Sequence, residues 1–119
     1  MWLTSKELAL VMARLADEKR ARHITLLEMA KVTTVTDYFL ICGASSTTQA
    51  RAIADHILEG LREEGVRPDH VEGYTSARWV LLDFGGVVVH VFVDEERRFY
   101  DLERLWGDAA PVPTATVNA

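Results

Sequence analysis

The sequence predicts a single α/β domain with a mixed β-sheet of about five strands, two long helices and a short C-terminal helix. Three observations lead to this prediction: two amphipathic helical stripes, a strand–helix–strand order between residues 38 and 74, and two apolar runs joined by Gly85-Gly86. A strand–helix–strand unit implies a right-handed parallel crossover. With 49% hydrophobic residues, the 119-residue chain can build one core. We expect residues 1–108 to form the domain and residues 109–119 to form a flexible C-terminal tail.

The composition narrows the classes of partner. Thirteen Lys and Arg stand against eighteen Asp and Glu, which gives a formal net charge of −5. A general nucleic-acid binder needs the opposite balance, so we expect a basic partner and no sequence-specific nucleic acid. The single cysteine, Cys42, excludes an internal disulfide and suits a reducing compartment. No secretory signal and no apolar run of about 20 residues is present, so the sequence predicts a cytoplasmic protein without a membrane partner.

The two helices are predicted from caps and stripes. Thr4 and Glu7 have capping-box spacing, as do Ser46 and Gln49. The apolar stripes that follow are Leu8, Val11, Met12, Leu15 and Ala16 in the first helix, and Ala50, Ile53, Ala54, Ile57, Leu58 and Leu61 in the second. Gly65 fits the left-handed position just past the end of the second helix.

The strands are predicted from short apolar runs. Ile24–Met29 and Tyr38–Cys42 are expected strands on either side of a Thr-rich connection. Trp79–Phe84 and Val87–Val93 are expected to form a hairpin, because two glycines tolerate the positive φ angles of a two-residue turn. Asp94 is expected to cap a terminal helix. That helix carries Phe99, Tyr100, Leu102, Leu105 and Trp106.

The hairpin register divides its side chains between two faces, because side chains alternate along a strand. The apolar face holds Val80, Leu82, Phe84, Val87, Val89, Val91 and Val93. The mixed face holds Trp79, Leu81, Asp83, Val88, His90 and Phe92. Two long helices cover only one face of a small sheet, and the apolar face suits them. The mixed face is then covered by the terminal segment around Trp106, by a second copy of the chain, or by another protein, since its aromatic and polar residues are typical of an interface.

Three groups of residues contain side chains that are typical of catalytic, phosphate-binding or metal sites. His90 beside Asp83 could form a general base with its orienting carboxylate, but a polar contact within an interface is favoured because no nucleophile lies nearby in sequence. The Gly43–Ser46 turn could offer amides to a phosphate, although helix capping explains it better. The acidic run Asp94–Glu96 could bind a metal, although it also complements a helix dipole. We therefore expect no enzyme activity, no cofactor and no metal.

The combined motifs have a specific resemblance. They are Thr36–Cys42, Ala52–Asp55, Glu72-Gly73, Trp79–Gly85, Val88–Phe92 and Phe99–Trp106. Together they closely resemble the ribosomal silencing factor family, also called Iojap-like proteins, from about Ser5 to Trp106. Two departures are Glu28, where many relatives have Asp, and Ala44, where some have Gly.

The resemblance implies a fold related to nucleotidyltransferases without their catalytic carboxylates. It also implies a translational repressor that binds ribosomal protein number fourteen of the large subunit, blocks the small subunit from joining when nutrients are scarce, and forms homodimers off the ribosome. The docking surface implied for this chain comprises Trp79, Leu81, Asp83 and His90, with Phe92, Asp94 and Glu95 as neighbours. Two alternatives stay open: a nucleotidyltransferase-like enzyme, and a module that only self-associates through the mixed face.

Overall fold

The predicted hairpin is present with the expected register. Its strands are β4 (Trp79–Asp83) and β5 (Val87–Val93). The antiparallel partners are Trp79 with Phe92, Val80 with Val91, Leu81 with His90, Leu82 with Val89, and Asp83 with Val88. The Phe84 amide donates to the Val87 carbonyl at 2.9 Å, and Gly85 adopts φ +81° in the turn. The assignment of each side chain to the apolar or the mixed face is therefore confirmed.

Both long helices are confirmed, with one correction to their caps. Helix α1 spans Ser5–Glu18 and α2 spans Thr47–Glu63. The capping box at the start of α1 is complete, since the Glu7 amide donates to Thr4 Oγ1 and the Thr4 amide donates to Glu7 Oε1. At α2 the Gln49 amide donates to Ser46 Oγ, but Gln49 Oε1 accepts from the Ser45 amide rather than from Ser46. The second capping box is therefore only half formed.

The structure, a computed structural model, describes residues 3–113 and contains one mixed sheet of six strands, one more than expected. The remaining strands are β1 (Arg22–Glu28), β2 (Tyr38–Ala44), β3 (His70–Glu72) and β6 (Ala110–Val112). The order is β3-β4-β5-β2-β1-β6, and β2 and β5 form the parallel pair. Strand β3 lies antiparallel to β4, so the crossover from β2 through α2 joins two parallel strands that are separated by β5 and β4.

The C-terminal part differs from expectation in two ways. The terminal helix is split into α3 (Asp94–Tyr100) and α4 (Leu102–Leu105), because Asp101 adopts the left-handed conformation between them. The N-cap of α3 is Val93, so the prediction that Asp94 caps the helix is wrong. The expectation of a tail is wrong for Ala110–Val112, which pair with β1 as β6. Residues 114–119 lie outside the described part of the chain.

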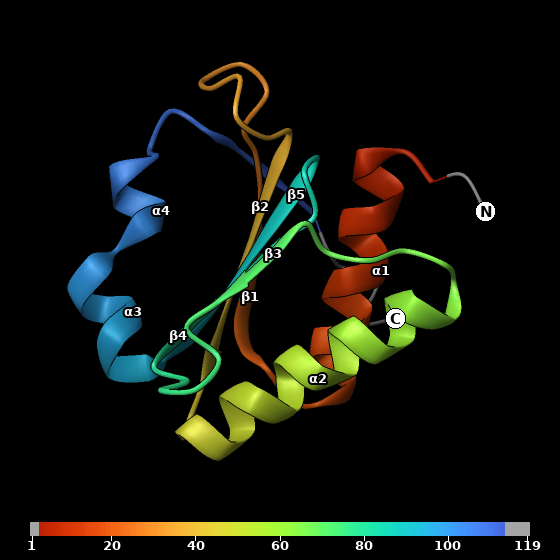
Figure 1. The fold of residues 1–119 in the computed structure, drawn as a ribbon. Helices are drawn as coiled ribbons and strands as arrows, with labels where there is room; N and C mark the ends of the chain where they lie inside the picture. Colours follow the sequence, from red (N-terminus) through yellow and green to blue (C-terminus); the bar gives the residue numbers. More distant parts are fainter. Residues whose placement is uncertain (1–2, 114–119) are drawn as a thin grey trace.

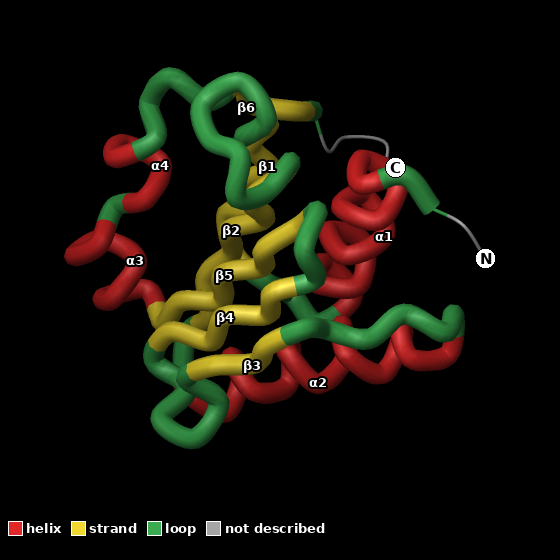
Figure 2. Tube along the Cα trace, turned by 45° about the horizontal axis from the view of Figure 1, so that its top comes forward, coloured by secondary structure: helices red, strands yellow, loops and turns green. Residues whose placement is uncertain are grey.

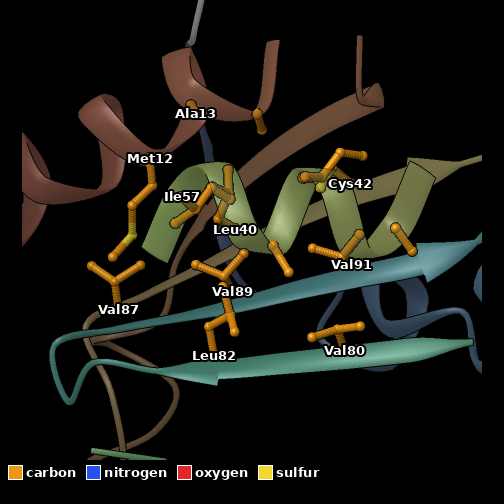
Figure 3. Packing of buried hydrophobic residues seen from close by; sticks show 14 of the residues in the cluster. Met12, Ala13, Leu40, Cys42, Ile57, Val80, Leu82, Val87, Val89 and Val91 are labelled. Atoms are coloured by element: carbon orange, nitrogen blue, oxygen red, sulfur yellow. The ribbon is translucent and has the colours of Figure 1, made fainter. Parts of the chain in front are cut away.

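Helices cover both faces of the sheet, but unequally. Figure 1 shows α1 and α2 on one face and the short helices α3 and α4 on the other, and Figure 2 shows the six strands between these layers. The α1–α2 layer forms the larger core, in which Met12 and Ile57 point towards the valines of β5 (Figure 3). The smaller core lies under α3 and α4 and contains Ile41, Phe92 and Leu102. The apolar face is thus the floor for the two long helices, as predicted.

Gly73 provides a test of how the loop before β4 is packed. Its φ is +75°, and a Cβ atom there would lie 2.1 Å from the Trp79 carbonyl oxygen. Gly65 has nearly the same φ, +77°, yet a Cβ there would meet nothing within 4 Å. We predict that Gly65→Ala lowers the free energy of unfolding by about 1 kcal/mol, the cost of the left-handed backbone alone.

Gly73→Ala carries the same backbone cost and also a steric clash, so we predict a loss of roughly 3 kcal/mol or more. Urea unfolding of both variants measures the difference. Equal losses would contradict the close approach of Gly73 to β4.

Candidate docking surface

One end of the mixed face is covered by an aromatic stack. Trp79 lies 4.8 Å from Phe92 and 4.7 Å from Tyr100 between ring centroids. Trp79 Nε1 also donates to His90 Nδ1 at 3.1 Å. Phe92 and His90 are consequently buried, with exposed fractions of 1% and 4%. At this end Trp79 is half-buried, and the buried side chains of Phe92 and His90 lie beneath it.

The layer over this end is held by two arginines. Arg97 of α3, whose side chain is 11% exposed, donates to the Arg22 carbonyl, to Thr25 Oγ1 and to the Glu103 carboxylate. Arg78 forms ion pairs with Glu96 at 2.9 Å and with Glu95 at 3.8 Å. These contacts attach α3 to strand β1 and to Arg78, the residue directly before β4. They determine which part of the mixed face lies under α3 and which part stays open.

The other end of the mixed face is an open groove of about 350 Å³. It is lined by Val35, Phe39, His70, Glu72, Leu81, Asp83, Val88 and His90. Val35 is 81% exposed, although it is a large aliphatic residue, and Leu81 is half-buried. We call this the β4 groove. Apolar side chains that the chain itself leaves uncovered, with polar groups around them, are typical of a surface that binds another protein.

Carboxylates give the β4 groove an acidic edge. Asp83 Oδ1 accepts from the Gly85 amide at 2.8 Å, and its other oxygen lies 3.5 Å from His70 Nδ1. Glu72 lies on the neighbouring strand β3 and is exposed. The lining contains no Lys or Arg. The groove therefore favours a partner that carries positive charge.

The predicted site residues separate into three positions. Leu81, Asp83 and His90 line the β4 groove together. Trp79 and Phe92 belong to the covered end. Asp94 and Glu95 lie outside the groove, where Asp94 pairs with Arg22 at 3.3 Å and Glu95 pairs with Arg78.

Sequence reasoning missed Val35, Phe39, His70 and Glu72. Phe39 could have been found, because it alternates with Leu40 on a predicted strand and must face away from the large core. Strand β3 is only three residues long and all three are exposed, so no apolar period marked His70 or Glu72. Val35 lies in a Thr-rich connection, whose path the sequence does not fix.

The alternative chemical sites find little support in the geometry. Asp83 contacts His70, while His90 contacts Trp79, so no hydrogen bond joins His90 to Asp83 within residues 3–113. At the Gly43–Ser46 turn, the Ser45 amide and hydroxyl both donate to Gln49 Oε1. No group of three or more His, Cys, Asp or Glu that could hold a metal occurs among the described residues. No helix within the same part of the chain is long and apolar enough to cross a membrane.

Burial also makes Cys42 and His90 poor reactive groups. Desolvation raises the pKa of the Cys42 thiol to about 12, which keeps it protonated. Desolvation lowers the pKa of His90 from 6.5 to about 4. His90 is therefore neutral near pH 7, and because its Nδ1 accepts from Trp79, its proton is on Nε2. His90 Nε2 is a buried polar atom without a hydrogen-bond partner among the described residues.

A small α/β domain with a partly covered sheet face, an apolar groove and an acidic edge has the features of a protein-binding regulatory module. Comparison with known proteins shows the family to which the chain belongs. The family described as "Ribosomal silencing factor during starvation" matches residues 3–119. The chain therefore belongs to the ribosomal silencing factor family, as its motifs predicted, and this membership supports a ribosome-associated role in silencing translation.

Individual relatives agree with this assignment. "Ribosomal silencing factor RsfS" of Bacillus subtilis is 46% identical over 107 residues, which cover 90% of this chain and 91% of that protein. A solved structure from Bacillus halodurans is 40% identical, with a TM-score of 0.81 over 91% of this chain and 98% of that one. A second, protein CV0518 from Chromobacterium violaceum, is 31% identical, with a TM-score of 0.86 over 88% of both chains. The predicted α/β fold is thereby confirmed.

The buried imidazole leads to a prediction about stability and pH. The unfolded chain binds a proton at His90 near pH 6.5, whereas the folded chain binds it only near pH 4. The contribution of His90 to the free energy of unfolding is therefore fully present above pH 6.5. It is lost as the pH falls to 4, and the total loss is about 3 kcal/mol. We predict that His90→Gln, whose amide oxygen can still accept from Trp79, removes most of this fall.

The measurement is urea unfolding of both proteins at pH 7.5, 5.5 and 4.5. Since the two proteins share every other titratable group, the difference between the two curves reports His90. Parallel curves would show that His90 is not desolvated in the folded protein.

Proposed function

We propose that this protein represses translation by binding the large ribosomal subunit through the β4 groove, so that the small subunit cannot join. We propose a basic ribosomal protein as the partner, and the family resemblance implies ribosomal protein number fourteen. The observation that carries the proposal is the uncovered groove with its acidic edge, because it offers apolar contact area and attracts positive charge.

Leu81 and Asp83 are proposed as direct contacts, together with Val35, Phe39 and Glu72. Trp79 contributes its exposed edge, while His90 and Phe92 act by holding Trp79 in place. Asp94 and Glu95 act indirectly, because their ion pairs hold α3 over the covered end. A blocker of this kind works by occupying space, and so it needs neither a nucleophile nor a cofactor.

The name of one relative supports a large-subunit role. "Mitochondrial assembly of ribosomal large subunit protein 1" of Mus musculus is 29% identical over 99 residues, which cover 81% of this chain and 43% of that protein. We propose that the present chain also acts on the large subunit, under nutrient limitation, in the cytoplasm. Off the ribosome we propose a homodimer, in which a second copy shields exposed apolar surface.

Val35→Arg tests the β4 groove directly. Because Val35 is 81% exposed, the change leaves the fold intact, with a stability effect within about 0.5 kcal/mol. In the complex it places a bulky cation against a basic partner, and we predict at least a tenfold loss of affinity, about 1.4 kcal/mol. Cosedimentation with purified large subunits measures the affinity.

Thr34→Arg is the matched control, since Thr34 is an exposed neighbour in the same loop that does not line the groove. It adds the same charge and should bind normally. Loss of binding by both variants, or by neither, would remove the β4 groove as the docking surface.

The acidic edge leads to a separate prediction. Asp83→Asn keeps an oxygen for the Gly85 amide, and Glu72→Gln keeps the size of its side chain. We predict that the double variant associates with the large subunit several-fold more slowly and with a weaker dependence on salt, since charges at the rim of an interface act mainly on the association rate.

Glu63→Gln with Glu64→Gln removes the same charge at the end of α2 and is the control. Stopped-flow binding at two salt concentrations compares the two proteins. If both variants slow equally, the effect reflects net charge and not the acidic edge of the groove.

A further inference from the structure

A second exposed surface lies on α3 and α4, beside the aromatic stack. Six residues line a hollow of about 540 Å³: Arg98, Phe99, Tyr100, Asp101, Arg104 and Leu105. Phe99 is 81% exposed and Leu105 is 69% exposed. We call this surface the α3–α4 patch. Neither the packing of the sheet nor the β4 groove explains why an aromatic ring is left so exposed here.

The charges of the patch differ from those of the whole chain. The carboxylates of α3 are engaged, since Asp94 pairs with Arg22, and both Glu95 and Glu96 pair with Arg78. Arg98 and Arg104 form no ion pair with any residue in the described range 3–113. Asp101 is the single carboxylate among the six lining residues. The patch therefore has an excess of positive charge in a chain whose net charge is −5.

The α3–α4 patch and the β4 groove lie on the same side of the sheet. Helices α3 and α4 cover the face opposite α1 and α2 (Figure 1), which is the mixed face. The aromatic stack connects the two surfaces. Tyr100 lines the patch and its ring lies 4.7 Å from that of Trp79, and Trp79 Nε1 donates to His90, which lines the groove. A body as large as a ribosomal subunit docked on the groove therefore also faces the patch.

We propose that the α3–α4 patch binds ribosomal RNA of the large subunit while the β4 groove binds the basic ribosomal protein. Arg98 and Arg104 contact phosphates, and Phe99 stacks on an unpaired base, which is the usual role of exposed aromatic residues in RNA-binding proteins. This inference rests on the proposed function, because it requires docking on the subunit.

Charge favours RNA as the ligand of the α3–α4 patch over a basic ribosomal protein or a second copy of this chain. A basic ribosomal protein would meet Arg98 and Arg104 with like charge. A second copy, paired by a two-fold axis through the patch, would bring four arginines against two Asp101 carboxylates. RNA phosphates complement both arginines, and a base provides the flat surface that suits Phe99.

The first test separates the two surfaces. We expect Arg98→Gln with Arg104→Gln to lower affinity for the large subunit about tenfold at low salt. The slope of log affinity against log salt should become shallower by about 1.4, since each phosphate contact contributes roughly 0.7. Binding to isolated ribosomal protein number fourteen should stay unchanged.

Arg14→Gln with Arg67→Gln is the control, because both arginines are exposed and lie on the α1 and α2 side of the protein. It should behave like wild type. An unchanged salt slope in the patch variant would overturn the inference while leaving the proposed function standing. Failure of the wild-type protein to bind large subunits would overturn both.

The second test identifies what the patch touches. A benzophenone side chain placed at position 99 is irradiated on purified large subunits, and the adducts are digested with ribonuclease. An adduct that ribonuclease shortens supports the inference. An adduct with a ribosomal protein, or with a second copy of the chain, overturns it.

Discussion

The β4–β5 hairpin is the constraint on which the rest of the structure depends. A two-residue turn at Gly85-Gly86 fixes the register, and alternation then assigns every side chain of the two strands to one face. A slip by one residue would turn Trp79 and Leu81 into the large core and move Val80 and Leu82 to the mixed face. Because the apolar face is sealed by α1 and α2, such a slip would cost most of the core. The stability of the large core thus specifies the composition of the mixed face.

The mixed face is divided by the chain itself. Helix α3 covers the end near Phe92, and Arg97 and Arg78 hold it there. The groove at the other end is left open, since no described element packs across Leu81. The covered end also supports the edge of the groove: Tyr100 and Phe92 pack against Trp79, and Trp79 donates to His90, which fixes the tautomer of His90. The buried end is therefore the support for the exposed end.

Most of the fold could be predicted because its signals are local. Caps, stripes and the Gly-Gly turn each act within a few residues, so α1, α2 and the hairpin register were predicted correctly. Strands β3 and β6 were harder, because each is three residues long and is defined by its partner rather than by its own pattern. The break at Asp101 was not foreseen either, since no glycine marks the left-handed position between the two short helices.

The sequence predicts the site only to the extent that side chains alternate between the two faces of a strand. Alternation places Leu81, Asp83 and His90 on one face, but it does not say which of them the terminal helices cover. That outcome depends on the contacts of Arg78 and Arg97. The hydrogen bond from Arg97 to the Arg22 carbonyl joins residues 75 positions apart, and the ion pair of Arg78 with Glu96 joins the start of β4 to α3. The ion pairs of Arg22 and Arg78 neutralise the acidic start of α3, while Arg98 of α3 and Arg104 of α4 form no ion pair with any described residue. An acidic chain thereby presents an acidic groove and a basic patch on one side, a combination that fits a ribosomal surface made of both basic protein and RNA better than it fits either alone.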